Sequence, residues 1–584
     1  MENCKLSDTL ELRIYNKLVF LYGKERAEKY LEKFVYLVHE YKKRLPDNVK
    51  NIKSWFDQQD IVLITYGDQF ISSDGNSTLH NLNAFLTENY KNIINSVHIL
   101  PFYPYSSDDG FSVIDYWQVN KELGSWADII SLSKGFNIMF DAVVNHISSE
   151  SSWFQEYLKG NPEYSNFFIE VNESQDLSSV TRPRALPLLT RFRQLETDKF
   201  IWTTFSDDQI DINYANPEVL LKVTELILFY VSMGASMLRL DAIGYLWKRF
   251  HTTCINLEET HTIVRFLRDI TDAVNPGIKI VTETNIPHKE NISYFGNGFD
   301  EAHMVYQFAL PPLVMHSFFR GTASYLIDWA DQLEFPSDNT TYFNFLASHD
   351  GIGVMPVKGI LPDEEIQELC KLAVNRGGHV SYKNNTDGSA SPYELNIVYF
   401  NAIANPKDNA DRQIDMFLCA HAIMLSMKGV PGIYIHSLLG SQNYSKGVEN
   451  SGRNRSINRE KFQISQLEEE LNRADSHRSR IVQKMKDILA VRAEHKAFHP
   501  NGEQKIIKIN SKVFSMLRCA PDLTEAILCL HNVSGEKECI EIKLEDSMSG
   551  NYTDILSGQN IEAEDNTLKI VLGEYQAAWY RKNN

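Results

Sequence analysis

The sequence has no long hydrophobic run and few cysteines. No apolar stretch approaches the roughly 20 residues that a membrane-spanning helix needs, and the N-terminal MENCKLSDTLELR carries acidic residues where a secretory leader is basic. The seven cysteines include no CxxC pair and no Cys/His cluster, which argues against a disulfide framework and a structural zinc site. We therefore expect a cytoplasmic protein.

Positive charge is also scarce. The chain holds 58 Lys and Arg against 76 Asp and Glu, a formal charge of −18, so nucleic acids and anionic membranes are not expected partners. An anionic substrate would need a local basic pocket, and the candidate is the segment with Arg182, Arg184, Arg191 and Arg193. A solvated loop with scattered charge is the alternative interpretation, and at this point both stay open.

Short apolar runs dominate the chain from residue 61 onward. With 584 residues, 43% of them hydrophobic, the chain can form more than one globular domain. Eight apolar runs interleaved with helical patterns predict an α/β fold, a (β/α)8 barrel with parallel strands inside and helices outside. The runs are IVLITY, SVHILPF, NIMFDAVV, MLRLDA, KIVTET, HMVYQF, FNFLASHD and GVPGIYI.

The other segments predict additions to this barrel. Apolar residues at helical spacing near the N-terminus indicate helices, through which a homodimer could form. Long connections after the third and seventh runs indicate insertions, and the C-terminal segment alternates apolar and polar residues like an antiparallel sheet. We expect an N-terminal helical extension at 1–57, the barrel at 58–145 and 215–498, a small inserted domain at 146–214, a loop insertion at about 351–411 and a C-terminal β domain at 499–584.

Three carboxylates close predicted strands. Asp241, Glu283 and Asp350 end the fourth, fifth and seventh runs, and the C-terminal strand ends of such a barrel form its active site. A sugar acetal is broken by a nucleophilic carboxylate working with a protonated one, and a third acid helps to bind and distort the ring. A single Asp at a strand end is more often a cap or an ion-pair member, but three in this order favour a carbohydrate enzyme.

Neighbouring residues indicate a role for each carboxylate. Arg239 lies two positions before Asp241, so both point to the same side of a strand. We expect this guanidinium to lower the pKa of Asp241, which suits a nucleophile. Glu283 follows apolar residues and has no cation beside it, which is compatible with the raised pKa of a general acid. His349 and Asp350 are expected to bind sugar hydroxyls.

Four segments resemble the conserved regions of the α-amylase superfamily, glycoside hydrolase family 13. They are DAVVNH at 141–146, LRLDAIGY at 238–245, VTETN at 281–285 and ASHDG at 347–351, in the family's order. The resemblance covers nearly the whole chain after the N-terminal extension. It implies a retaining double displacement with Asp241 as nucleophile, Glu283 as acid/base and Asp350 as transition-state stabiliser, supported by Asp141, Asn145, His146, Arg239 and His349.

Within this family the chain is similar to the sucrose phosphorylase group. The segments ITYGDQF, LPFYPYSSDDGFSVID, TRPRALP, TTFSDDQIDIN, FALPPL and RSINR carry that likeness. It implies a glucosyl site in which Arg455 pairs with Asp68, Phe205 lies beside the glucosyl carbon and Gln209 is a nearby polar contact. Core packing is the alternative interpretation of Phe205 taken alone.

Three departures from the sucrose pattern indicate an acceptor other than fructose. Tyr116 and Asn285 stand where the sucrose-specific enzymes carry histidine, and the loop SPYELN also differs. All three variants resemble the glucosylglycerate phosphorylases of the group. That resemblance implies reversible phosphorolysis of 2-O-α-D-glucosyl-D-glycerate, with Arg184 contacting phosphate, Arg182 near a carboxylate and Tyr393 supplying a hydroxyl.

Several alternatives remain open. The nearest is another phosphorylase acting on sucrose, sucrose 6-phosphate or glucosylglycerol, followed by a hydrolase or transglucosidase that uses the same intermediate. An inactive sugar-binding barrel would lack at least one carboxylate, and none is missing. Some relatives in the larger family bind calcium near the position of Asn145, but the chain has no dense oxygen-ligand loop. We therefore expect small-molecule partners, namely the glucosyl donor, phosphate and D-glycerate, and no cofactor.

Overall fold

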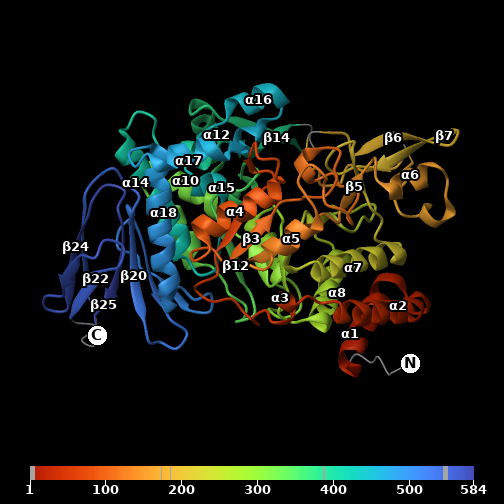
Figure 1. The fold of residues 1–584 in the computed structure, drawn as a ribbon, viewed down its shortest axis with the longest axis horizontal. Helices are drawn as coiled ribbons and strands as arrows, with labels where there is room; N and C mark the ends of the chain where they lie inside the picture. The colour runs from red at the N-terminus through yellow and green to blue at the C-terminus, as the bar shows by residue number, and fades with distance from the viewer. Residues whose placement is uncertain (1–6, 173, 185, 386–388, 544–549, 584) are drawn as a thin grey trace.

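Eight parallel strands close into a barrel at the centre of the molecule (Figure 1). The computed structural model describes residues 7–172, 174–184, 186–385, 389–543 and 550–583. The barrel strands are almost entirely buried, as expected of apolar runs covered by the core on one side and by helices on the other. In order around the barrel they are β1 (Val62–Thr65), β16 (Val430–Tyr434), β12 (Thr341–Phe345), β11 (Met304–Tyr306), β10 (Lys279–Thr282), β9 (Ala235–Leu240), β4 (Asn137–Ala142) and β3 (Ser96–Ile99).

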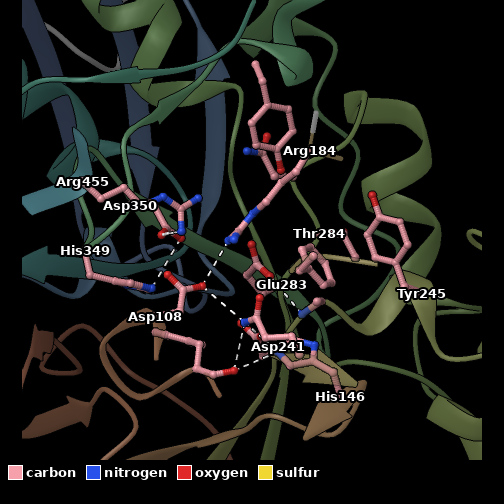
Figure 2. Close-up of a pocket in the computed structure, with 16 residues that line it drawn as sticks. Asp108, His146, Arg184, Asp241, Tyr245, Glu283, Thr284, His349, Asp350 and Arg455 are labelled. Atoms are coloured by element: carbon pink, nitrogen blue, oxygen red, sulfur yellow. Dashed lines mark hydrogen bonds and ion pairs between the residues drawn. The ribbon is translucent and has the colours of Figure 1, made fainter. Parts of the chain in front are cut away.

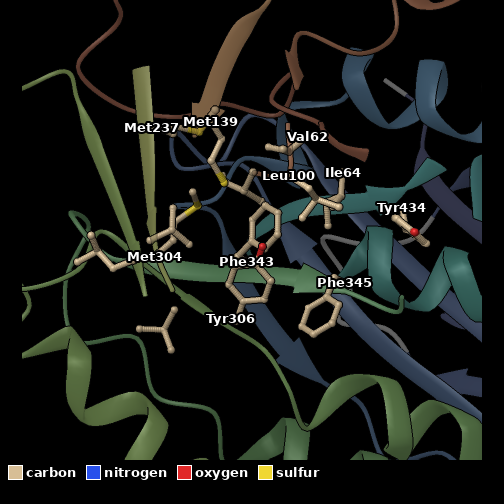
Figure 3. Close-up of a cluster of buried hydrophobic side chains, with 14 of the residues drawn as sticks. Val62, Ile64, Leu100, Met139, Met237, Met304, Tyr306, Phe343, Phe345 and Tyr434 are labelled. Carbon is tan, nitrogen blue, oxygen red and sulfur yellow. The ribbon is translucent and has the colours of Figure 1, made fainter. Parts of the chain in front are cut away.

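Large side chains fill the barrel interior (Figure 3). Met139, Met237 and Met304 come from three strands and lie close to the ring of Phe343, and all four are buried. Gly432 on β16 leaves room for that ring, because a Cβ at this position would collide with Phe343. This packed interior gives the strand ends a rigid base.

Helices cover the outside of the barrel. On α8 the buried residues Ile263, Phe266, Leu267 and Ile270 recur at helical spacing, so one apolar face packs on the strands. The outer helices are α4 (Thr78–Tyr90), α5 (Trp126–Leu132), α7 (Pro217–Ser232), α8 (Glu258–Val274), α10 (Leu310–Arg320), α11 (Ser324–Asp331), α14 (Ala410–Ser426) and α18 (His477–Glu494). Shorter elements are α3 (Asp47–Lys50), β2 (Phe70–Ile71), α9 (His288–Asn291), α13 (Tyr399–Ile403), α15 (Ile435–Leu438), α16 (Ser445–Ser451), β17 (Phe462–Gln463) and α17 (Ile464–Asn472).

The N-terminal segment forms a helical hairpin of α1 (Asp8–Tyr22) and α2 (Lys24–Lys43). It packs against α7 and α8 on one flank of the barrel (Figure 1). Arg13 and Lys17 pair with Asp269 of α8 at 2.8 and 2.6 Å, and the Tyr30 hydroxyl donates to Glu218 of α7 at 2.8 Å. The extension is thus tied to the barrel by both packing and charge.

Two long connections extend from the C-terminal ends of barrel strands. The first follows β4 and contains β5 (His146–Ser148), α6 (Ser152–Leu158), β6 (Leu189–Gln194), β7 (Thr197–Trp202) and β8 (Gln209–Asp211). The second follows β12 and contains β13 (Ile352–Gly353), α12 (Asp363–Asn375), β14 (His379–Asn384) and β15 (Ala390–Asn396). Both connections supply side chains to the mouth of the barrel.

An antiparallel sheet forms the C-terminal region. Its strand order is β18 (Glu503–Ile506), β19 (Val513–Cys519), β20 (Ala526–Asn532), β25 (Ala577–Lys582), β22 (Asn551–Asp554) and β23 (Asn560–Glu562), and β21 (Glu538–Lys543) pairs separately with β24 (Thr567–Leu572). Two buried arginines lie near the contact between this region and the barrel, Arg518 on β19 and Arg492 on the outer helix α18. Arg492 donates to the carbonyls of Leu425 and Gln58 at 3.0 and 2.7 Å, and Arg518 donates to the carbonyl of Ser426 at 2.6 Å.

The observed architecture confirms the predicted fold class. All eight apolar runs named from the sequence are barrel strands, and the C-terminal region is an antiparallel sheet. The domain boundaries drawn from the sequence stay predictions. Within the described ranges, no helix is both long and apolar enough to cross a membrane.

Candidate active site

Three carboxylates meet at the C-terminal mouth of the barrel. Asp241 follows β9, Glu283 follows β10 and Asp350 lies beyond β12, and all three line one cavity of about 70 Å³ (Figure 2). The other lining residues are Asp108, Phe111, His146, Arg184, Phe205, Gln209, Ala242, Tyr245, Thr284, Asn285, His349, Tyr393 and Arg455.

A single guanidinium links two of these carboxylates. Arg239 Nη1 donates to Asp241 Oδ1 at 2.8 Å, and Arg239 Nη2 lies 3.8 Å from Glu283 Oε2. Glu283 Oε2 also accepts from the backbone N–H of Ala242 at 3.1 Å. The two carboxylates therefore share one buried cation and face one cavity, although they come from different strands.

Burial governs the protonation of this pair. It raises the pKa of the Asp241 carboxyl well above its ordinary range, while Arg239 opposes the rise and Glu283 adds to it. Burial also raises the pKa of Glu283, again against the attraction of Arg239. The expectation of a raised pKa for Glu283 is met, but a net lowering for Asp241 is wrong, because lost hydration outweighs the attraction of one shared guanidinium.

Asp350 has the opposite electrostatic surroundings. It lies 2.6 Å from Arg455 Nη1 and 3.7 Å from Arg459 Nη2. Although burial raises it, the attraction of these guanidinium groups, led by Arg455, holds the pKa of Asp350 well below its ordinary range. Burial lowers the pKa of the adjacent His349 to about 3, so this ring is uncharged at neutral pH. Asp350 is a stable anion beside a neutral donor.

Comparison with known proteins identifies the family to which this chain belongs. Residues 91–358 match the family described as Alpha amylase, catalytic domain. The chain is 47% identical to the glucosylglycerate phosphorylase of Spirochaeta thermophila over 97% of this chain and 98% of the relative, and 45% identical to that of Escherichia coli K12 over 98% and 100%. The chain belongs to the α-amylase family.

A solved structure has the same overall fold. The crystal structure of sucrose 6F-phosphate phosphorylase from Thermoanaerobacter thermosaccharolyticum matches with a TM-score of 0.73 and 24% identity, over 89% of this chain and 99% of that chain. At that identity the match shows the fold alone. The family resemblance inferred from the four sequence segments is confirmed by the relatives.

Most residues that the family resemblance implied lie together in the structure. Arg184 pairs with Asp108 at 3.1 Å, and its guanidinium lies 5.6 Å from the centre of the Phe205 ring. Gln209 Nε2 lies 3.3 Å from the same Asp108 carboxylate. The implied residues that line the cavity with the carboxylates are His146, Arg184, Phe205, Gln209, Asn285, His349, Tyr393 and Arg455.

The implied pair of Asp68 and Arg455 is wrong. Strand β17 pairs with β2 and brings Lys461 against Asp68, outside the carboxylate cavity. Arg455 instead pairs with Glu394 at 2.7 Å, in addition to Asp350. The Asp68 carboxylate is therefore already neutralised, and the structure separates it from the group that it was expected to meet.

Tyr116 and Arg182 also lie outside the cavity lining. The Tyr116 hydroxyl donates to the backbone carbonyls of Val143 and His146 at 2.7 and 3.1 Å, which places it under the cavity wall. Arg182 donates to the carbonyl of Leu186 at 2.9 Å within its own loop. In this arrangement Tyr116 supports the backbone near His146, and Arg182 braces the loop that carries Arg184.

Sequence reasoning missed Asp108, Phe111 and Tyr245. Asp108 and Asp109 precede Gly110, and all three have positive φ values of 54°, 49° and 108°, so this turn projects two carboxylates in sequence. Partial burial raises the pKa of Asp108, yet Arg184 and Arg455 hold this pKa well below its ordinary range. The two acids before a glycine in SSDDGF could have indicated a turn that carries site carboxylates. Here the motif supported only the family resemblance.

An ammonium group lies next to Asn145, the position near which some relatives in the larger family bind calcium. Lys248 Nζ donates to Asn145 Oδ1 at 3.0 Å and pairs with Asp211 at 2.5 Å. Across the ranges that the structure describes, no group of three or more His, Cys, Asp or Glu side chains could hold a metal ion. The positive charge next to Asn145 is supplied by the chain itself.

Proposed function

We propose that this chain catalyses the reversible phosphorolysis of 2-O-α-D-glucosyl-D-glycerate to α-D-glucose 1-phosphate and D-glycerate. The substrate is supported by the two relatives of that name, which match nearly the full length of the chain at 47% and 45% identity. The observation that carries the proposal is that Asp241, Glu283 and Arg184 face one cavity. This set supplies a nucleophile, an acid and an anion-binding group.

In the first half-reaction, Asp241 attacks the anomeric carbon of the glucosyl group. The bond from that carbon to the glyceryl oxygen breaks, and Glu283 gives its proton to the departing oxygen. Asp241 is the ionised member of the pair because Arg239 bonds it directly at 2.8 Å but lies 3.8 Å from Glu283. Of two coupled buried carboxyls, the one with the closer cation releases its proton first.

In the second half-reaction, phosphate replaces glycerate beside the β-glucosyl enzyme. A phosphate oxygen attacks the anomeric carbon, the bond to Asp241 breaks, and the product keeps the α configuration after two inversions. Phosphate already carries nucleophilic oxyanions, so the Glu283 carboxylate need not act as a strong base. Read in reverse, the same steps form glucosylglycerate from glucose 1-phosphate.

Both small substrates on the acceptor side are anions, although the chain carries a formal charge of −18. Arg184 lines both the carboxylate cavity and a wider vestibule of about 480 Å³ that leads to it. We assign phosphate binding to Arg184, with the Tyr393 hydroxyl beside it. Asp108 and Asp350, each held near Arg455, are assigned to the glucosyl hydroxyls in place of Asp68.

The pH dependence of kcat/KM follows from the roles of Asp241 as nucleophile and Glu283 as acid. The kcat/KM profile should be bell-shaped, with an acid limb where Asp241 becomes protonated and an alkaline limb where Glu283 loses its proton. Since burial raises the pKa of both groups, both limbs should lie at higher pH than for exposed carboxyls.

An acceptor panel tests the proposal. Glucose 1-phosphate is supplied with D-glycerate, fructose, fructose 6-phosphate, glycerol or no acceptor, and released phosphate and free glucose are measured. We expect D-glycerate to give the highest kcat/KM. A preference for fructose, fructose 6-phosphate or glycerol would assign one of the other phosphorylase activities, and free glucose without acceptor would indicate a hydrolase.

We also propose that the reaction needs no metal and takes place in the cytoplasm. The Lys248 ammonium beside Asn145 supports the first statement. Prolonged dialysis against EDTA should leave kcat unchanged within about twofold, and recovery of activity only after added Ca²⁺ would contradict it. The homodimer expected from the N-terminal helices stays a prediction.

A further inference from the structure

A histidine lies behind the reacting carboxylates. His98 belongs to β3 and is fully buried. Its ring Nε2 lies 2.7 Å from Oδ2 of Asp141 on the adjacent strand β4. Its other ring nitrogen, Nδ1, is buried without a hydrogen-bond partner among the described residues.

The surroundings define which nitrogen carries the proton. Although burial raises it, the Arg239 guanidinium and then His98 bring the pKa of Asp141 below its ordinary value, so Asp141 is an anion. Burial lowers the pKa of His98 in spite of this neighbour, so its ring is neutral. A neutral ring beside a carboxylate acceptor must donate through Nε2–H, which leaves Nδ1 as a bare acceptor.

Asp141 connects this histidine to the nucleophile. The second oxygen of Asp141 accepts a hydrogen bond from Arg239 Nη1. The same nitrogen donates to Asp241 Oδ1 at 2.8 Å. Strands β4 and β9 place Asp141 directly beside Arg239 in register. Two carboxylates thus share one guanidinium nitrogen, and the orientation of Asp141 decides how this nitrogen is divided between them.

We propose that His98 is a positioning residue that holds Asp141 so that Arg239 remains bound to the nucleophile Asp241. The inference rests on the proposed function, in which Asp241 attacks the glucosyl carbon. The Nε2–H bond fixes the Asp141 carboxylate about its last side-chain torsion. It also draws part of the negative charge of Asp141 away from Arg239, which leaves the guanidinium more available to Asp241.

Packing alone does not account for His98. The flanking β3 residues Val97 and Ile99 are fully buried and apolar, and an aliphatic side chain would also fill this space. A buried imidazole with one unpartnered nitrogen is unfavourable compared with such a side chain. The favourable counterpart is the single bond to Asp141, which leads toward the active site.

The charged groups around Asp241 allow the proposal to be tested by the pH profile of kcat/KM. The groups that face Asp241 are Arg239 on the preceding strand β9, Glu283 after β10, Asp141 on β4 and the nearby Tyr116 hydroxyl. Without the His98 bond, Asp141 should attract Arg239 more strongly. Asp241 then loses part of its cation, and the acid limb of kcat/KM should move to higher pH.

The experiment compares His98→Leu with His98→Gln in the full chain. The leucine variant removes the donor, whereas the glutamine amide restores an N–H near the position of Nε2 and does not titrate. We expect His98→Leu to lower kcat by about 10- to 100-fold, the loss seen when the outer hydrogen-bond partner of a metal ligand is removed, with KM for glucosylglycerate changed less than about threefold. His98→Gln should recover most of kcat and return the acid limb.

His303 provides a matched control. It is also buried next to the barrel strands, but its Nδ1 accepts from the backbone N–H of Ile280. His303→Leu should lower the thermal midpoint without moving the acid limb. If His98→Leu does not fold, His98→Met, whose flexible side chain adapts to irregular gaps, replaces it.

Several results would overturn the assignment. One is an unchanged kcat and acid limb in His98→Leu. Another is equal impairment of the leucine and glutamine variants with only a lower thermal midpoint, since a packing role would produce that. A wild-type enzyme that releases free glucose instead of glucose 1-phosphate would refute the proposed function, and the His98 effect would then be measured on glucose release.

Discussion

Two buried arginine sites in this molecule have opposite surroundings. Arg239, at the C-terminal mouth of the barrel, bonds the carboxylates of Asp141 and Asp241. Arg492 and Arg518, at the other end of the barrel, donate hydrogen bonds only to backbone carbonyls of the described residues. All three guanidinium groups are 2% exposed or less, so burial alone does not distinguish them.

The two sites differ in the groups that neutralise the charge of the guanidinium. Leu425 and Ser426 are the last residues of α14, and the carbonyls at a helix C-terminus carry fixed negative partial charge. Those dipoles do not exchange protons. The carboxylates around Arg239 can exchange protons, so the same kind of cation stabilises packing at one end of the barrel and lies among titratable groups at the other.

The largest effect is expected from Asp241→Asn at the mouth. The change removes the proposed nucleophile but keeps the shape of the side chain. Turnover should fall by at least about 10⁴-fold, while the thermal midpoint should not decrease, because one crowded buried carboxylate is lost. Phosphate release and differential scanning calorimetry measure the two quantities, and activity within tenfold of wild type would mean that the nucleophile is misassigned.

The buried arginines at the other end of the barrel should respond in the opposite way. Arg492→Met keeps much of the volume but leaves the carbonyls of Leu425 and Gln58 without their donor, so the free energy of unfolding should drop by about 3 kcal/mol. The kcat per folded molecule should stay within about twofold of wild type. Arg249→Met, which removes an exposed ion pair with Glu259, is the control and should cost under about 1 kcal/mol.

A smaller effect with a defined sign is expected from Glu283→Gln. Burial raises the pKa of Glu283, so its stabilising proton binding is complete below the unfolded pKa and is lost as pH rises through the folded pKa. Glutamine does not titrate. The variant should therefore gain about 1 kcal/mol over wild type above that pKa, and the gain should shrink toward pH 4. Denaturant unfolding at several pH values measures it, and an opposite trend would contradict the raised pKa.

The smallest effect should come from Asp68→Asn. Asp68 pairs with Lys461 outside the cavity and is 38% exposed, so KM for glucosylglycerate should change less than about twofold. Asp108→Asn, inside the cavity, should raise the same KM by at least about tenfold. Similar KM values for the two variants would restore Asp68 to the sugar site.

The sequence predicted the barrel because its strands are apolar runs of strand length separated by amphipathic helices. It also predicted the convergence of Asp241, Glu283 and Asp350, since parallel strands end at one rim. The Asp68 contact was wrong because β2 pairs with β17, a contact between distant segments. The net pKa of Asp241 was wrong because burial depends on the whole fold, whereas a sequence neighbour such as Arg239 is visible locally.

The position of the α1–α2 hairpin in the chain also affects the order of folding during synthesis. The hairpin is synthesised before its docking surface on α7 and α8, which follows roughly 200 residues later. At about 5–20 residues per second, the hairpin waits on the order of 10–40 s with its apolar side uncovered. During that interval the uncovered apolar side of the hairpin is a natural substrate for chaperones, and the hairpin can dock only once α7 and α8 have been synthesised.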